Sequence, residues 1–298
     1  LSSVVASQHE IHGPYAGVVP ELASRAHVER ILPTVREALA EAGVGLGMLS
    51  AVAVGHRPGL IGSLLVGVSA AKALAWALDL PLIGVDHVQA HLCAGALAAE
   101  GEEPPSAEFP ALGLVVSGGH TSLYRMSSLV EMERLGGTID DAMGEAFDKA
   151  ATILGLPYPG GPKLDRLASG YAGPPAPEFP VSRLGKESLD FSFSGLKTAV
   201  LYAAKGVPGD RAPAPPPPLD DARRAMLAAG FQRAAVKAVV LKLARAAEHV
   251  PGCRMLAAGG GVTANSLLRR ELERVAKERG WRLLLPRMQY CVDNAAMI

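Results

Sequence analysis

Apolar residues along the first part of the chain recur in runs that predict helices joined to short strands. The first run, residues 21–42, predicts a helical region that Pro20 opens and Gly43 closes. Pro33 lies inside this region, and a proline there removes a backbone hydrogen bond, so we expect two consecutive helices. The short apolar run at residues 51–55 predicts a strand.

The longest apolar run, residues 60–80, also predicts a helix. Small, polar and charged residues interrupt it at Gly62, Ser63, Gly67, Ser69, Lys72 and Asp79. We therefore expect a buried core helix rather than a membrane span. A strand at residues 82–85 follows, and then a helix that starts near Asp86.

The rest of the chain continues the alternation of strand and helix. Two apolar runs flank a glycine turn and predict a hairpin of residues 111–116 and 121–126. The later elements expected are helices at 140–154 and 220–249, a strand at 254–258, and a helix that ends near Gly280. Strands and helices that alternate at these spacings indicate an α/β fold.

Composition excludes some classes of function. The 298 residues carry 29 Lys and Arg against 29 Asp and Glu, a formal net charge of zero. The chain is therefore not a strongly basic nucleic-acid-binding protein, and an RNA partner would need a local basic patch or a second protein. Three distant cysteines, Cys93, Cys253 and Cys291, indicate a reducing cytoplasm rather than a disulfide framework. No signal peptide is visible.

The chain looks truncated at both ends. It starts at Leu1 without an initiator methionine, inside what looks like an ordered segment. It stops at Ile298, inside the apolar, helix-like run of residues 293–298. We therefore expect a fragment of a longer protein.

The pair His87 and His91 is the first candidate for chemistry. Residues four apart share one face of a helix, so the two imidazoles can hold one metal ion. Zinc proteases of the HExxH type place a glutamate base after the first histidine, but here that position is Val88. The pair therefore fits a metal that binds substrate. Asp293 is a candidate third ligand, and two histidines with one carboxylate suit iron(II) or zinc.

The second candidate for a functional site is a set of three glycine-rich turns, at residues 117–121, 158–162 and 259–265. Backbone N–H groups in such turns can approach phosphate, and the third turn lies at the start of a predicted helix. The chain has neither a P-loop motif nor a G-x-G-x-x-G motif. Together the turns suggest a nucleotide in a cleft between two lobes, as in actin-like ATPases.

Two further polar segments have no single role assigned from the sequence. Asp141, Glu145 and Asp148 share one face of the helix predicted at 140–154. Such a face is commonly solvated, and the acids could instead hold ribose hydroxyls or order the cleft. Residues 191–198 mix aromatic and hydroxyl side chains with one lysine, which predicts a strand end turning into a helix.

Taken together, these sequence motifs resemble those of the tRNA N6-adenosine threonylcarbamoyltransferase family, whose members were once labelled glycoproteases. The motifs that carry the resemblance are residues 17–25, 87–91, 117–121, 138–141, 144–149, 158–162, 191–198, 259–265 and 293–298. They span nearly the whole chain in the family's order. The amino-acid sequence of residues 58–67 is similar to that of bacterial members of the family.

The resemblance implies a two-lobed actin-like ATPase (ASKHA) fold of the α/β class, with nucleotide and metal in the cleft between the lobes. Residues 1–110 would form the N-terminal lobe, which lacks its first strands and is completed by residues 286–298. Residues 111–285 would form the C-terminal lobe.

The resemblance also implies a reaction. The threonylcarbamoyl group of threonylcarbamoyl-AMP would pass to N6 of the adenosine beside the anticodon, in tRNAs that read ANN codons, with release of AMP. One divalent metal would be held by His87, His91 and Asp293, with Fe(2+) ahead of Zn(2+). The residues implied to contact the adenylate substrate are Val116, Ser117, Gly118, Gly119, His120, Asp148, Gly161, Asp165 and Asn265. The partners would be tRNA, a degenerate TsaB-like paralogue and a small TsaE-like ATPase, in the cytoplasm and without a membrane.

The chain departs from the family pattern in two places. The family normally opens with a strand hairpin that carries an Asp-Glu-Thr phosphate loop, and this segment is absent here. The acidic residue of that loop is the candidate proton acceptor, so no general base is assigned within this sequence. Arg57 replaces the glycine that normally precedes Pro-Gly-Leu. The alternatives are a metallopeptidase, a non-catalytic scaffold and an actin-like sugar or acetate kinase.

Overall fold

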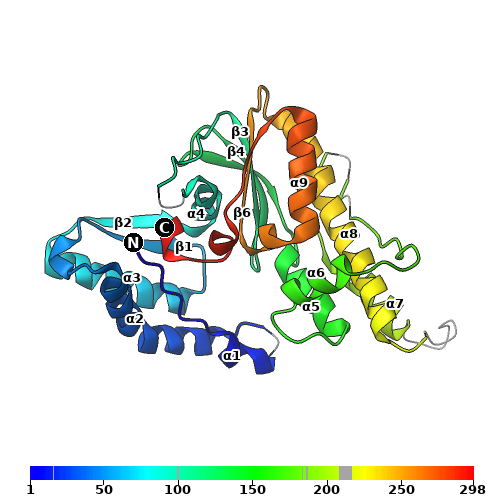
Figure 1. Ribbon diagram of the computed structural model, residues 1–298, viewed down its shortest axis with the longest axis horizontal. Coiled ribbons are helices and arrows are strands. Elements are labelled where there is room, and N and C mark those ends of the chain that lie inside the picture. The colour runs from blue at the N-terminus through cyan, green and yellow to red at the C-terminus, as the bar shows by residue number, and fades with distance from the viewer. Residues whose placement is uncertain (16, 99–100, 183, 186, 208–216) are drawn as a thin grey trace.

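The computed structural model describes residues 1–15, 17–98, 101–182, 184–185, 187–207 and 217–298 (Figure 1). Within these residues the strands form two sheets, one of two strands and one of five. The smaller sheet pairs β1 (Val52–Arg57) in parallel with β2 (Leu82–Asp86). The larger sheet has the strand order β5-β4-β3-β6-β7.

The larger sheet is built around β3 (Ala111–Val116), in which every residue is buried. It runs antiparallel to β4 (Thr121–Met126) and parallel to β6 (Met255–Gly259). The two edge strands are β5 (Met132–Gly137) and β7 (Arg282–Leu284). Successive side chains of a strand point to opposite faces, so a strand that is apolar at every position needs cover on both faces.

Helices of the second half of the chain gather on one side of this sheet and share one hydrophobic core with it (Figure 1). They are α5 (Met143–Ile153), α6 (Gly161–Ser169), α7 (Ser194–Lys205), α8 (Asp221–Ala246) and α9 (Ser266–Arg279). Leu112, Leu114 and Val116 of β3 face the largest core, in which the rings of Phe147 and Phe231 meet edge to face with centroids 4.9 Å apart. This core anchors the sheet from which the site is built.

The short helix α4 (His87–Cys93) covers the other face of β3. Its Val88 and Leu92 pack with Ala111 and Val115, the alternate residues of the strand. The backbones come so close that a Cβ on Gly259 would overlap the carbonyl oxygen of His91, so β6 needs a glycine there. The two histidines of α4 are therefore fixed beside the ends of β3 and β6.

The last residues of the chain return to α4, where the C-terminus lies beside β1 in Figure 1. Met297 packs with Ala90 and Ala94 of α4, and Val85 and Ile298 complete this small cluster. Because α4 also packs on the larger sheet, it contacts both parts of the chain. A lobe boundary at residue 110, with 286–298 assigned to the first lobe, stays a proposal.

The N-terminal region contains α1 (His9–His12), α2 (Pro20–Ala42) and α3 (Ile61–Leu78). The expected break at Pro33 is wrong, because α2 is one continuous helix of 23 residues that ends on Gly43 in the left-handed conformation. Pro33 is exposed, so solvent can hydrate the carbonyl that loses its partner, and the helix continues through the proline.

The prediction for residues 60–80 is confirmed for the helix and wrong for its burial in the core. Helix α3 forms where expected, but only 11% of its apolar window is buried and Trp76 is 87% exposed. The helix packs on α2 and on a sheet of only two strands, which is too small to cover it. By length and composition alone α3 could cross a membrane, a test that helices of soluble proteins also pass.

Other differences concern strands and one helix start. The hairpin of β3 and β4 is confirmed with the expected bounds. The local sequence pattern does not predict β5 and β7, which lie at the sheet edges and carry several polar residues. Helix α5 starts at Met143 rather than at Asp140, because Asp140 and Asp141 precede it and bond to other segments.

Candidate active site

Three side chains form a candidate metal site. His87 and His91 are the first and fifth residues of α4, and the Asp86 carboxylate caps this helix by accepting the N–H groups of Val88 and Gln89 at 2.9 and 3.2 Å. Asp293 Oδ1 lies 3.5 Å from His87 Nε2 and 3.3 Å from His91 Nε2. The ligand atoms of all three residues lie within 4.8 Å of one another.

The surroundings of the two imidazoles fit a divalent metal. His91 is fully buried, and neither ring nitrogen forms a well-oriented hydrogen bond within the described residues, although Nε2 lies 3.3 Å from the Asp293 carboxylate. Burial lowers the pKa of His87, against the opposing charge of Asp293, so its neutral form is favoured. A neutral imidazole is the form that binds metal, and a buried nitrogen without a well-oriented hydrogen bond is free to do so. Two histidines and one carboxylate suit iron(II) or zinc.

The turn between β3 and β4 lies beside this cluster. The Ser117 N–H donates to the His120 carbonyl at 2.8 Å, and the His120 N–H donates to Ser117 Oγ at 3.1 Å. At Gly118 and Gly119 a Cβ would meet no atom within 4 Å, so the space in front of the turn is open. A ligand can therefore approach the backbone of the turn closely.

The start of α5 holds this turn in place. The Gly144 N–H donates to the Ser117 carbonyl at 3.2 Å, and the Met143 N–H donates to Thr121 Oγ1 at 2.8 Å. A Cβ on Gly144 would stand 2.6 Å from the Ser117 carbonyl oxygen, which only glycine avoids. The position of the turn therefore depends on where α5 begins.

A cavity of about 620 Å³ joins the turn to the metal cluster, and we call it the donor cavity. Its polar lining includes His87, Asp293, Tyr158 and residues 117–120, and its apolar wall includes Leu64. Ligand pockets in proteins commonly have this volume and an apolar lining with a few polar groups. The cavity can hold a small molecule in contact with both the cluster and the turn.

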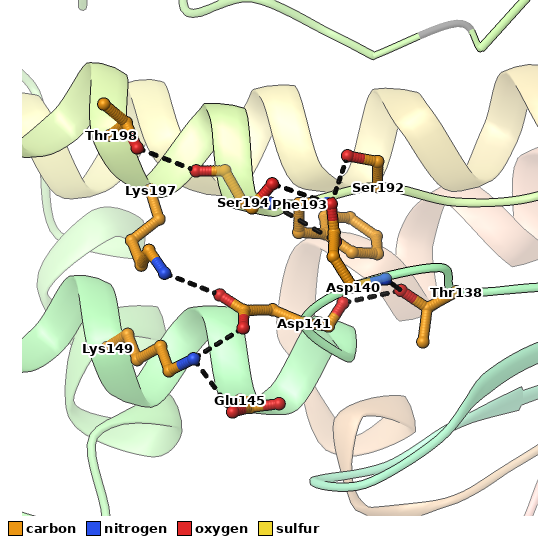
Figure 2. Close-up of polar contacts among 10 residues, drawn as sticks. All are labelled: Thr138, Asp140, Asp141, Glu145, Lys149, Ser192, Phe193, Ser194, Lys197 and Thr198. Atoms are coloured by element: carbon orange, nitrogen blue, oxygen red, sulfur yellow. Dashed lines mark hydrogen bonds and ion pairs between the residues drawn. The ribbon is translucent and has the colours of Figure 1, made fainter.

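Figure 2 shows a polar network that fastens residues 138–141 to the segment 191–198. The Asp140 carboxylate accepts the hydroxyls of Ser192 and Ser194 at 2.5 and 2.7 Å, and the Phe193 N–H at 2.8 Å. Burial would raise the pKa of Asp140, but these hydrogen bonds outweigh it and lower the pKa. The carboxylate is therefore ionised and holds the start of α7 against the segment before α5.

Asp141 forms the second half of this network, with two lysines. Its carboxylate accepts Lys149 Nζ at 2.5 Å and Lys197 Nζ at 3.0 Å, and Lys149 also pairs with Glu145 at 2.9 Å (Figure 2). Burial alone would raise the pKa of Asp141, but the two lysines lower it. Asp141 thus ties α5 to α7 through two lysines, while the Glu145 side chain is about half exposed.

Four residues implied to bind the adenylate make hydrogen bonds within the protein. Asp148 accepts the N–H groups of Gly160 and Gly161 at 2.8 and 3.0 Å, at the start of α6. Asp165 accepts the Ser266 N–H at 3.0 Å and its hydroxyl at 2.7 Å, and Asn265 caps α9 through the Leu268 N–H. These residues do not line the donor cavity, so the structure groups only residues 117–120 with the metal cluster.

The donor cavity has further lining residues, among them Tyr158 of the candidate glycine turn 158–162 and residues of the N-terminal region that had no assigned role. Tyr158 enters from the turn before α6, and its pKa is raised by burial and by Asp148. His12, Val18 and Leu60 come from the N-terminal region. Val18 and Leu60 lie in the sequence segments 17–25 and 58–67, which are similar to the family but had no assigned role. Their place in these segments could have marked them as candidate site residues.

Comparison with known proteins identifies the family. The family model described as TsaD, tRNA N6-adenosine threonylcarbamoyltransferase, matches residues 1–298. The chain belongs to this family. A relative of that name from Symbiobacterium thermophilum is 52% identical, and the match covers 100% of this chain and 82% of the relative. One from Anaeromyxobacter dehalogenans strain 2CP-1 is also 52% identical, with 100% and 85% covered.

Solved structures agree with the fold. HypF from T. kodakarensis superimposes with a TM-score of 0.57 at 17% identity, over 86% of this chain and 40% of HypF. HypF has the actin-like ATPase fold, so the predicted α/β fold of this class is confirmed. At this identity the likeness concerns the fold alone.

We expect replacement of His91 to remove the metal. A chain with alanine there keeps two of three ligands, and its affinity for Fe(2+) or Zn(2+) should fall by more than about 100-fold, because changes outside the ligand shell already cost 10- to 100-fold. Metal content after anaerobic reconstitution and gel filtration measures this. His249→Ala, outside the cluster, is the matched control. Equal metal content in both variants would contradict the assigned ligands.

We expect Asp141→Asn to destabilise the protein by about 2 kcal/mol, because two charge-assisted hydrogen bonds are lost. The folded-state pKa of Asp141 is lowered, so its contribution is present above its ordinary pKa of about 4 and is lost as pH falls through the lower folded value. Urea unfolding at pH 7 and towards pH 3 should show the difference shrinking with acid. Glu145→Gln, at an exposed pair, should cost under about 0.5 kcal/mol. A pH-independent difference would contradict this assignment.

Proposed function

We propose that the protein transfers the threonylcarbamoyl group of threonylcarbamoyl-AMP to N6 of the adenosine next to the anticodon in tRNAs that read ANN codons. The product is threonylcarbamoyladenosine in tRNA, and AMP is released. The observation that carries this proposal is the match to the family over all 298 residues, together with relatives whose length the chain covers to 82–85%. The donor cavity beside a His-His-Asp cluster supports it.

The proposed donor site combines the cluster with the turn. His87, His91 and Asp293 would hold one divalent metal, with iron(II) preferred over zinc, and the metal would supply Lewis-acid polarisation of a carbonyl group. The N–H groups of Gly118 and Gly119 would face the phosphate, because these glycines leave the backbone of the turn open. Val116 ends the strand that places this turn, and we assign it to the same substrate site.

The transfer itself is a substitution at the carbonyl carbon of the donor. The adenosine nitrogen forms a bond to this carbon, the bond from the carbon to the phosphate oxygen breaks, and the nitrogen loses one proton. We assign no proton acceptor within residues 1–298. The proposed task of this chain is to hold the two reactants in register, which alone can supply a large part of a rate acceleration.

The proposed adenylate contacts of Asp148, Gly161, Asp165 and Asn265 are compatible with their hydrogen bonds inside the protein. An ionised carboxylate offers about four acceptor positions, so Asp165 can hold Ser266 and still accept ribose hydroxyls. Asp148 fixes Gly161 at the start of α6, and Asn265 fixes the start of α9. In this proposal the four residues orient the ends of two helices towards the nucleoside.

The proposed partners are tRNA, a TsaB-like degenerate paralogue and a TsaE-like small ATPase, and the proposed location is the cytoplasm. The competing peptidase function finds no support in the geometry. Val88, the position of the glutamate base in HExxH proteases, is buried against β3. The presence of all three cluster residues also disfavours a non-catalytic scaffold.

The test is a product assay with the protein expressed from its complete gene. The protein, its two protein partners, threonylcarbamoyl-AMP and unmodified tRNA are incubated, and the nucleosides of the digested tRNA are identified by mass spectrometry. We expect threonylcarbamoyladenosine from the wild type and at least about a 100-fold loss with Asp293→Ala, because Asp293 would be one of three metal ligands. Absence of product from a metal-loaded wild type would refute the proposed function.

A further inference from the structure

A second cavity, of about 520 Å³, adjoins the donor cavity. The two cavities share Pro58, Gly119 and His120 as wall residues. Helix α4 also contributes to both, because Val88 and Gln89 line the second cavity while His87 lines the donor cavity. A molecule in the second cavity is thus separated from the donor cavity only by a few residues.

The second cavity is formed on the exposed side by the edge of the larger sheet. Ser122 and Tyr124 are alternate residues of β4, so they face the same side of the sheet, towards α4. Arg134 of β5 pairs directly with Tyr124 across the two strands. Since β5 is an edge strand, this part of the cavity opens towards solvent.

Charge in the second cavity favours an anion. Two guanidinium groups line it, those of Arg57 and Arg134, against the single carboxylate of Asp86. That carboxylate is already engaged by the Arg57 guanidinium at 3.1 Å and by two N–H groups of α4. Arg134 is exposed and has no ion pair within the described residues.

The aromatic lining complements this charge. Tyr124 is half-buried, and Met132 lies beside it on the neighbouring strand. An unpaired base stacks on an aromatic ring while its phosphate pairs with arginine, which is how proteins commonly bind single-stranded RNA. Because the chain as a whole has no net charge, such contacts must come from a local site of this kind.

We propose that the second cavity receives an unpaired nucleotide of the acceptor tRNA, with its phosphate on Arg134 and its base against Tyr124. This inference rests on the proposed function. The donor and acceptor must meet with reacting atoms about 3–3.5 Å apart. With the donor in its own cavity, the acceptor amine would meet the carbonyl group where the two cavities adjoin, beside Gly119 and His120.

The experiment uses the full-length protein with its partners and compares Arg134→Gln and Tyr124→Leu with the wild type. The readouts are the KM for tRNA, the KM for threonylcarbamoyl-AMP, and the Kd of a fluorescent anticodon stem–loop at several salt concentrations. We expect Arg134→Gln to raise the tRNA KM and the Kd about 10-fold and to lower the salt slope by about 1. Tyr124→Leu should raise both about 10-fold, and Tyr124→Phe should stay near the wild type because the ring is kept.

The matched control is Arg125→Gln. Arg125 is the next residue of β4, points to the opposite face and pairs with Glu133 at 3.3 Å, so its loss removes one positive charge outside the cavity. The KM for the donor should be unchanged in all variants, and circular dichroism verifies folding.

Several results would overturn the inference. Arg134→Gln and Tyr124→Leu could bind the stem–loop as tightly as Arg125→Gln does, or they could raise the KM for the donor instead of the KM for tRNA. If the wild type makes no threonylcarbamoyladenosine, the proposed function fails, and the stem–loop Kd still tests the cavity. Equal Kd values for all variants would then reject it as an RNA site.

Discussion

The backbone of α4 packs directly on the end of β6, and the geometry of the whole site depends on this contact. A glycine at position 259 permits the approach, because any Cβ there would overlap the carbonyl oxygen of His91. Val88 and Leu92 bury the helix against β3 on the same side. A helix of seven residues is marginal in isolation, so tertiary packing holds His87 and His91 at fixed positions. Asp293 joins them because the C-terminal residues pack on α4.

The opposite face of β3 supplies the second constraint. The strand alternates between two cores, so it cannot shift by one residue without exchanging both sets of side chains. The turn at 117–120 leaves the end of this strand, and Gly144 of α5 packs on it. The charged network of Asp140 and Asp141 ties the start of α5 to residues 191–198 (Figure 2). Motifs far apart in sequence therefore cooperate to place one turn beside one cluster.

Much of this was predictable from the sequence, for identifiable reasons. The β3–β4 hairpin has buried apolar runs around a glycine turn, and both signals are local. The edge strand β5 carries Glu133 and Arg134 and only pairs once β4 is in place, so local pattern could not reveal it. Pro33 was misread because its exposure, which lets the helix continue, is a tertiary property. The spacing of His87 and His91 predicted a shared face, but the approach of Asp293 needed the fold.

The central claim is that the His87, His91 and Asp293 cluster and the turn at 117–120 form one site for the donor. Crystals of the full-length protein with a non-hydrolysable analogue of threonylcarbamoyl-AMP, measured at the iron and zinc absorption edges, test it directly. We expect one anomalous peak among the three side chains, with the phosphate of the analogue on the backbone of the turn. A metal peak elsewhere, or an analogue bound away from both features, would contradict it.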